Sequence, residues 1–187
     1  MLLPIFAYGQ PVLKRVADEV AADYPELGTL IEDMWQTMYN AKGVGLAAPQ
    51  IGLSIRLFVV DTLQIDDEDA GKANGIKQVF INAYKIEEFG KPWAYEEGCL
   101  SIPDLRGDVE RPETIRLRYM NEQFEWKEMT LSGINARVVQ HEYDHIDGIL
   151  FIDKLKPLKK QLIRRRLEAI RLGNVRASYR LKFSKKQ

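Results

Sequence analysis

The chain is organised around the stretch SGINARVVQHEYDHIDG, which spans residues 132–148. Ser132 is a suitable N-cap at its start, and Asp147-Gly148 supplies a helix end. Along this stretch and just beyond it, side chains recur at steps of three and four, which predicts one face of a helix: Ile134, Val138, His141, His145 and Ile149. We therefore expect a helix that turns both imidazoles of the chain to the same side.

Both histidines of the chain belong to one H-E-x-x-H pattern, formed by His141, Glu142 and His145. Two neutral imidazoles suit a divalent transition metal, and a carboxylate beside them can handle the protons of a water molecule. A lone histidine is usually a surface or core residue, and so short a pattern can arise by chance. Both histidines on one helix face around a glutamate make coincidence the weaker interpretation, so the pattern indicates a metal site.

Two histidines are too few for a tight metal site, so a third ligand is expected. The longer peptidase pattern with a third histidine is not completed, because Phe151 stands at that position, and the only acid after Asp153 is Glu168, among arginines. Cys99 is the best remaining candidate, since a thiolate binds iron(II) and zinc strongly, although a lone cysteine is more often a core residue. Two imidazoles and one thiolate leave a position for water, which favours a catalytic site over a structural one.

The rest of the chain predicts an α+β domain spanning residues 1–187, a single catalytic domain with a basic C-terminal helix and tail at about 157–187. Apolar periodicity predicts an N-terminal helix over 25–42, and Pro157 suits the first turn of the last helix. Alternation and β-branched residues predict strands at 56–60, 78–82, 114–119 and 124–130, with an acidic loop at 66–75. We expect antiparallel or mixed β-sheets packed around the central H-E-x-x-H helix.

Composition indicates a globular cytoplasmic protein. The chain is 45% hydrophobic and 29% charged, and it has a single cysteine, which cannot form an intramolecular disulfide. No stretch approaches the roughly 18 apolar residues of a membrane span, and the N-terminus lacks the pattern of a signal peptide. We therefore expect a cytoplasmic enzyme and no membrane partner.

The formal net charge of zero conceals a strong asymmetry. Residues 154–187 carry 13 Lys/Arg and one acidic residue (13 − 1 = +12), whereas residues 1–153 carry 14 Lys/Arg and 26 Asp/Glu (14 − 26 = −12). A basic segment on an acidic body is most often a solvated helix face, but it also suits an anionic partner such as RNA.

Three motifs together resemble the peptide deformylases, the metalloenzymes that remove the formyl group from new bacterial proteins. Residues 43–50, GVGLAAPQ, match the family's G-x-G-L-A-A-x-Q; residues 97–101, EGCLS, match E-G-C-L-S; and residues 141–145, HEYDH, match H-E-x-D-H. Their order and spacing also agree, and the resemblance runs from about residue 2 to the last helix. It implies hydrolysis of N-terminal formyl-methionine on newly made proteins, with release of formate.

The resemblance also implies a role for each site residue. One Fe(II), for which nickel, cobalt or zinc can substitute, is expected on Cys99, His141 and His145, with Glu142 as the residue that moves the proton. The oxyanion is expected to receive hydrogen bonds from the backbone N–H of Leu100 and the side-chain amide of Gln50. Substrate contacts are expected from Val44, Gly45, Glu97, Gly98, Ile134 and Val138, and Arg106 is expected to support nearby carboxylates such as Glu97.

By the same resemblance, the expected partners are N-formylmethionyl nascent peptides and, through the basic C-terminal helix, the ribosome; no DNA partner is expected. Two other functions stay open at this point. An H-E-x-x-H endopeptidase would lack its usual third ligand here. A metal-stabilised RNA-binding module would use the basic tail and would have no need of Glu142 as a base.

Overall fold

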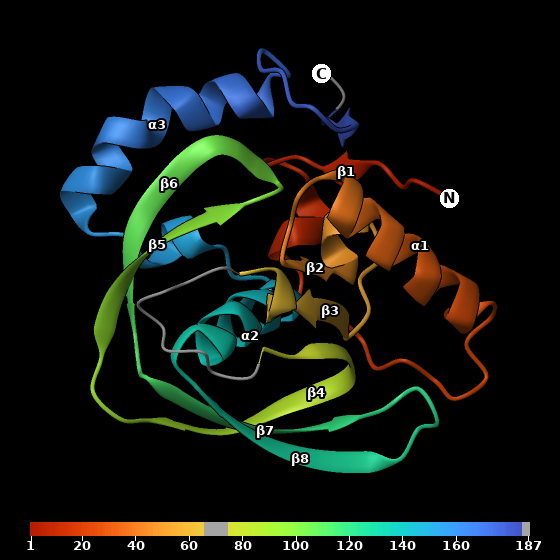
Figure 1. Ribbon diagram of the computed structural model, residues 1–187. Helices are drawn as coiled ribbons and strands as arrows, with labels where there is room; N and C mark the ends of the chain where they lie inside the picture. The colour runs from red at the N-terminus through yellow and green to blue at the C-terminus, as the bar shows by residue number, and fades with distance from the viewer. Residues whose placement is uncertain (66–74, 185–187) are drawn as a thin grey trace.

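The computed structural model describes residues 1–65 and 75–184, so the predicted acidic loop at 66–75 falls almost wholly outside the described residues. The fold is α+β, with helices α1 (Leu27–Asn40), α2 (Gly133–Ile146) and α3 (Pro157–Arg171). Figure 1 shows α2 at the centre of the molecule, above the curved strands β4, β7 and β8, while α1 and α3 lie on the outside. Four short 3-10 helices complete the helical structure described: Pro11–Lys14, Ala48–Ile51, Thr62–Gln64 and Phe151–Lys154.

The main sheet has five antiparallel strands in the order β2-β3-β4-β7-β8. The bounds of these strands are β2 Gly45–Ala47, β3 Leu57–Asp61, β4 Lys77–Phe89, β7 Thr114–Met120 and β8 Trp126–Ser132. A second sheet is the long hairpin of β5 (Trp93–Cys99) and β6 (Ile102–Arg111). The third is a short parallel pair of β1 (Ile5–Phe6) and β9 (Leu181–Lys182), which joins the two ends of the described chain. The hairpin and this pair had no counterpart among the strands predicted from the sequence.

Helix α2 is buried on almost every side. Ala136, Val139 and Ile146 pack into the core between the helix and the main sheet, which includes the stacked rings of Phe58 and Phe80. Its polar side chains are buried as well, and buried polar groups require partners. The helix therefore brings ionisable residues into the interior, where neighbouring elements must hold them.

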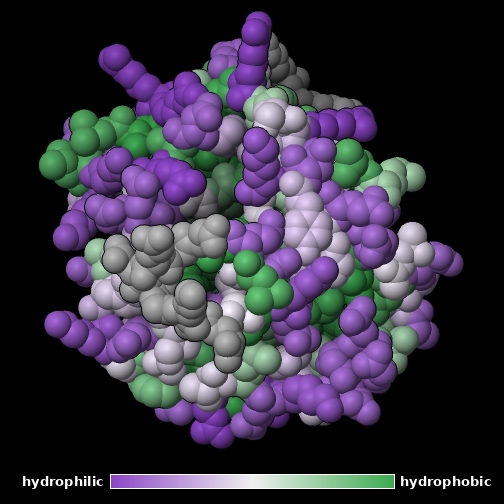
Figure 2. All heavy atoms as spheres, in the orientation of Figure 1, coloured by the Kyte–Doolittle hydropathy of each residue, from purple (hydrophilic) through white to green (hydrophobic). Residues whose placement is uncertain are grey.

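Helices α1 and α3 each attach to the body through a narrow apolar stripe. In α1, Ile31, Met34 and Met38 are buried in a second core on the other side of β2 and β3. In α3, Ile163 and Ile170 are buried, whereas Leu158 and Leu162 are largely exposed. Figure 2 shows the surface over α3 as mostly hydrophilic, with hydrophobic side chains at its end on the left. Within the described residues, no helix has the length and apolarity that a bilayer crossing requires.

Candidate metal centre

The structure brings the three predicted metal ligands together. Cys99 is the last residue of β5, and His141 and His145 lie one turn apart on α2. The sulfur and the ring nitrogens all lie within 4.8 Å of one another, and Cys99 Sγ is 3.4 Å from His145 Nε2. Two imidazoles and one thiol therefore converge on one point, as the motifs predict.

A buried carboxylate fixes the orientation of His141. Glu97 Oε2 lies 2.9 Å from His141 Nδ1, which leaves the Nε2 atom of the ring for the ligand cluster. Burial opposes the charge of Glu97, but hydrogen bonds from Arg111 and His141 outweigh it and hold the pKa of that carboxyl well below its usual range. A carboxylate that accepts from the far nitrogen of a ligand imidazole is a common support in metal sites.

Two buried arginines hold Glu97 in turn. Arg111 donates to both oxygens of Glu97, at 2.7 and 2.9 Å, and to Asp144 on α2 at 2.7 Å. Arg137, also on α2, donates to Glu97 Oε1 at 2.9 Å. These contacts join the hairpin to the central helix through a fully buried network of charges.

The expectation that Arg106 supports Glu97 is wrong. The Arg106 side chain is 67% exposed, and it lies 3.8 Å from Glu96. The strand register explains the error, because Gly107, Val109 and Arg111 are buried residues of β6, whereas Arg106 lies on the alternate, exposed face and lines the cavity beside Glu96. Counting in steps of two from Val109 would have identified Arg111 from the sequence.

Glu142 lies beside the ligand cluster in a position that requires Gly45. A Cβ atom added at Gly45 would overlap the Oε1 atom of Glu142, so only glycine leaves room for this carboxylate. Burial raises the pKa of Glu142 to about 7. Its Oε2 atom is buried and has no hydrogen-bond partner among the described residues, which suits a carboxylate that receives a ligand or water.

Gln50 presents its amide nitrogen to the cluster. Its Oε1 atom accepts from the backbone N–H of Ala47 at 2.8 Å, which fixes the orientation of the amide. The Nε2 atom then lies 3.4 Å from both Cys99 Sγ and Ser101 Oγ. The amide is thus held as a donor at the edge of the site.

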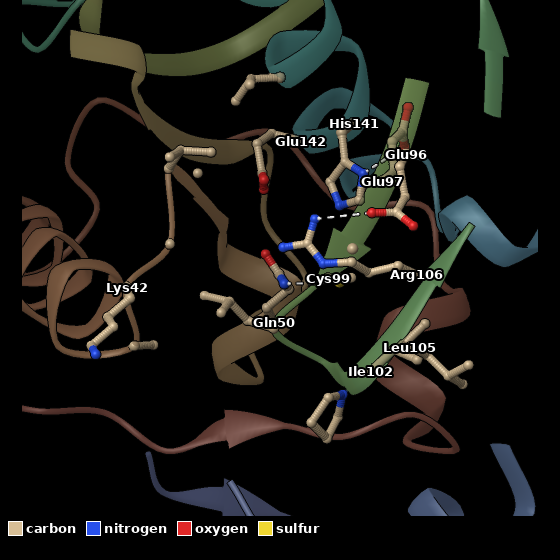
Figure 3. Close-up of a pocket in the computed structure, with 18 of the residues that line it drawn as sticks. Lys42, Gln50, Glu96, Glu97, Cys99, Ile102, Leu105, Arg106, His141 and Glu142 are labelled. Atoms are coloured by element: carbon tan, nitrogen blue, oxygen red, sulfur yellow. Dashed lines mark hydrogen bonds and ion pairs between the residues drawn. The ribbon is translucent and has the colours of Figure 1, made fainter. Parts of the chain in front are cut away.

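These groups face a cavity of about 690 Å³, within the range of small-ligand sites. In Figure 3, Gln50, Cys99, His141 and Glu142 point into the same space. Leu100 and all six residues predicted to contact substrate also line it: Val44, Gly45, Glu97, Gly98, Ile134 and Val138. Sequence reasoning missed the lining by Tyr95 and by Ala177, Ser178 and Tyr179, the last three being far from every motif in the sequence.

The side chains present fit a divalent transition metal. Burial lowers the pKa of His145 well below its ordinary value and so favours the neutral, ligating form of the ring. Burial also disfavours the charge on His141, but hydrogen bonds to Cys99 and Glu97 raise its pKa well above the ordinary value. One sulfur and two nitrogen donors suit iron(II) or zinc.

Comparison with known proteins finds relatives over nearly the whole chain. The polypeptide deformylase family model matches residues 2–161. A peptide deformylase of Christiangramia forsetii is 51% identical and covers 98% of this chain and 96% of its own. A solved peptide deformylase from Legionella pneumophila is 37% identical with a TM-score of 0.80, covering 94% of this chain and 99% of its own. A solved peptide deformylase from Acinetobacter baumannii with Met-Ala-Ser bound is 36% identical with a TM-score of 0.75, and it covers 83% of this chain and 99% of its own.

Proposed function

The chain belongs to the polypeptide deformylase family, and on this premise we propose which of its residues carry out the reaction. A peptide deformylase is a metal-dependent hydrolase that acts on nascent peptides. It cleaves the formyl group from an N-terminal formyl-methionine and releases formate. The endopeptidase and the RNA-binding module are not favoured, because the relatives that match over the full length are peptide deformylases.

Cys99, His141 and His145 are the proposed ligands of one iron(II), for which nickel, cobalt or zinc can substitute. The observation that carries this assignment is the convergence of one thiol and two ring nitrogens within 4.8 Å, beside a buried carboxylate. When bound, such an ion supplies a Lewis acid and lowers the pKa of nearby water. Glu97 lines the cavity, but both its oxygens are engaged by Arg111, Arg137 and His141, so its role is to orient His141 rather than to bind substrate.

Glu142 is the proposed proton carrier. Its carboxylate accepts a proton as the water oxygen bonds to the formyl carbon, and it returns the proton to the nitrogen as the C–N bond breaks. Formate and a free amino terminus result. A group whose pKa is near 7 can both accept and return a proton at neutral pH.

Gln50 and Leu100 are the proposed oxyanion donors. The Gln50 amide is held in place by Ala47 N–H and aims its nitrogen at the Cys99–Ser101 turn. The backbone N–H of Leu100 is the second donor. A donor that is fixed before the reaction stabilises developing charge without reorganising.

The methionine side chain is proposed to lie among Val44, Ile134 and Val138, which give the cavity an apolar wall near the metal ligands. Gly45 and Gly98 flank this region, and their backbone groups are proposed to pair with the backbone of the peptide. The substrate would then extend as a strand between β2 and the end of β5.

The test of this assignment is formate release from formyl-Met-Ala-Ser by Glu142→Gln. The variant should keep one metal ion per chain and lose about 10² to 10⁴ in kcat, because it keeps the shape of the side chain without a basic oxygen. Glu110→Gln, an exposed position on β6, is the matched control and should release formate at the wild-type rate. Full activity in Glu142→Gln would contradict the assignment.

The proposed location is the cytoplasm, where nascent chains are made, and the basic helix α3 is proposed to contact the ribosome. Support comes from the +12 charge of residues 154–187 and from the exposure of most of the basic side chains of α3. Binding of this kind weakens as salt rises. A chain truncated after Lys156 should lose co-sedimentation with ribosomes at low salt, and unchanged binding would contradict the proposal.

A further inference from the structure

The C-terminal segment returns to the cavity, although it lies beyond the part of the chain that the family model matches. That match ends at residue 161, whereas Ala177, Ser178 and Tyr179 line the cavity. The segment is fixed just afterwards, because β9 pairs in parallel with β1, with Leu181 opposite Ile5. In Figure 1 the chain runs back from the end of α3 toward β1, at the upper edge of the molecule.

Tyr179 makes a direct bond to the turn that follows the metal-binding cysteine. Its hydroxyl donates to the backbone carbonyl of Leu100 at 2.8 Å. The side chain is half-buried, and burial raises the pKa of Tyr179, so the phenol stays protonated and remains a donor. The bond joins two positions 79 residues apart in the sequence.

The turn that receives this bond is held by side chains and backbone outside its own hairpin. The ladder between β5 and β6 shifts register between Gly98 and Cys99, so the regular pairing does not continue into the turn. On one side the Gln50 amide contacts Cys99 and Ser101. Elsewhere the N–H of Tyr8 donates to Ser101 O at 2.8 Å. Tyr179 supplies the contact to Leu100, the residue between Cys99 and Ser101.

We propose that Tyr179 is a positioning residue for deformylation: by holding the carbonyl of Leu100, it fixes the backbone that carries the Cys99 thiol and the Leu100 N–H. The inference rests on the proposed role of the Leu100 N–H as an oxyanion donor. A donor of this kind acts on the transition state more than on the bound substrate, so its misplacement lowers kcat and leaves KM nearly unchanged. Tyr179 itself does not touch the reacting atoms.

The test is Tyr179→Phe, which removes one oxygen and keeps the packed ring. With nickel-loaded protein and formyl-Met-Ala-Ser, kcat should fall about fivefold, the scale of one lost hydrogen bond. KM, the metal content and the Kd of the product Met-Ala-Ser should stay at wild-type values. Backbone amides of the 99–102 turn should exchange with deuterium faster than in the wild type.

Ser184→Ala is the matched control, since Ser184 also ties the C-terminal segment to a backbone carbonyl, that of Gly9, at 3.0 Å. It should leave both kcat and the exchange of the turn unchanged. The proposal is overturned if Tyr179→Phe keeps the wild-type kcat, if it changes KM alone, or if Ser184→Ala lowers kcat equally. Absence of formate release by the wild-type protein would instead contradict the proposed function, and the exchange measurement would still test the contact.

Discussion

The charge network behind His141 permits a quantitative prediction for Arg111→Met. The Arg111 side chain is 3% exposed and donates three hydrogen bonds to two buried carboxylates, Glu97 and Asp144. Removing one partner of a buried ion pair costs about 3–5 kcal/mol, since the other partner remains as an uncompensated charge. In the variant, Glu97 would still pair with Arg137, and Asp144 would still lie 3.4 Å from Lys154. The lower end of that range therefore applies. We expect a loss of about 3 kcal/mol in the free energy of unfolding.

The assay is urea unfolding followed by circular dichroism, with metal affinity measured in parallel. Loss of support for a ligand imidazole typically weakens metal binding by about 10- to 100-fold. Arg106→Met makes the same change at an exposed arginine whose nearest acidic group is 3.8 Å away, and it should unfold like the wild type because exposed pairs contribute little. Equal stability of the two variants would contradict this prediction, as would an Arg111→Met protein with the wild-type unfolding midpoint and metal affinity.

Three further predictions concern the site itself. Gly45→Ala places a methyl group against the Glu142 carboxylate and should lower kcat by about 10², the scale of a misplaced catalytic group. Gly28→Ala, which adds its Cβ in open space, should keep the wild-type kcat. Equal kcat values for the two variants would contradict the close approach of Gly45 to Glu142. Gln50→Ala should lower kcat on formyl-Met-Ala-Ser by about 10² to 10³ through loss of an oxyanion donor, and a rate near that of the wild type would remove Gln50 from the mechanism. Iron-loaded protein should lose activity in air through oxidation of Cys99 and of the iron, whereas nickel-loaded protein should keep its activity. Equal air stability of the two forms would count against iron(II) as the working metal.

The sequence predicted the centre of the molecule better than its edges. Helix α2 begins after Ser132 as predicted, although the Ser132 hydroxyl makes no capping hydrogen bond and lies 3.0 Å from the Thr114 hydroxyl instead. Its bounds could be predicted because periodicity and the end signal are local properties of the sequence. Of the predicted face, Ile134, Val138 and His141 line the cavity, whereas Ile149 lies beyond the helix end at Ile146. Ala136 and Val139, which were not part of that face, fill the core together with Val138. A helix buried all round has no single apolar face, so periodicity alone could not separate these roles.

The parts that were missed depend on contacts between distant segments. The β5–β6 hairpin carries charged residues on its outward positions and a glycine beside the cysteine, so its strand pattern is weak in the sequence. Arg111 was overlooked because the register that turns it inward is set by pairing with β5. The return of Tyr179 to Leu100 spans 79 residues and has no local pattern at all.

The most direct test of the proposed metal centre is the X-ray absorption spectrum of the protein loaded with one equivalent of nickel or zinc. One sulfur at about 2.3 Å and two imidazole nitrogens at about 2.0–2.1 Å are expected in the zinc form, and the sulfur should disappear in Cys99→Ser. A spectrum without sulfur in the wild-type protein, or with a complete set of protein ligands that leaves no position for water, would contradict the account.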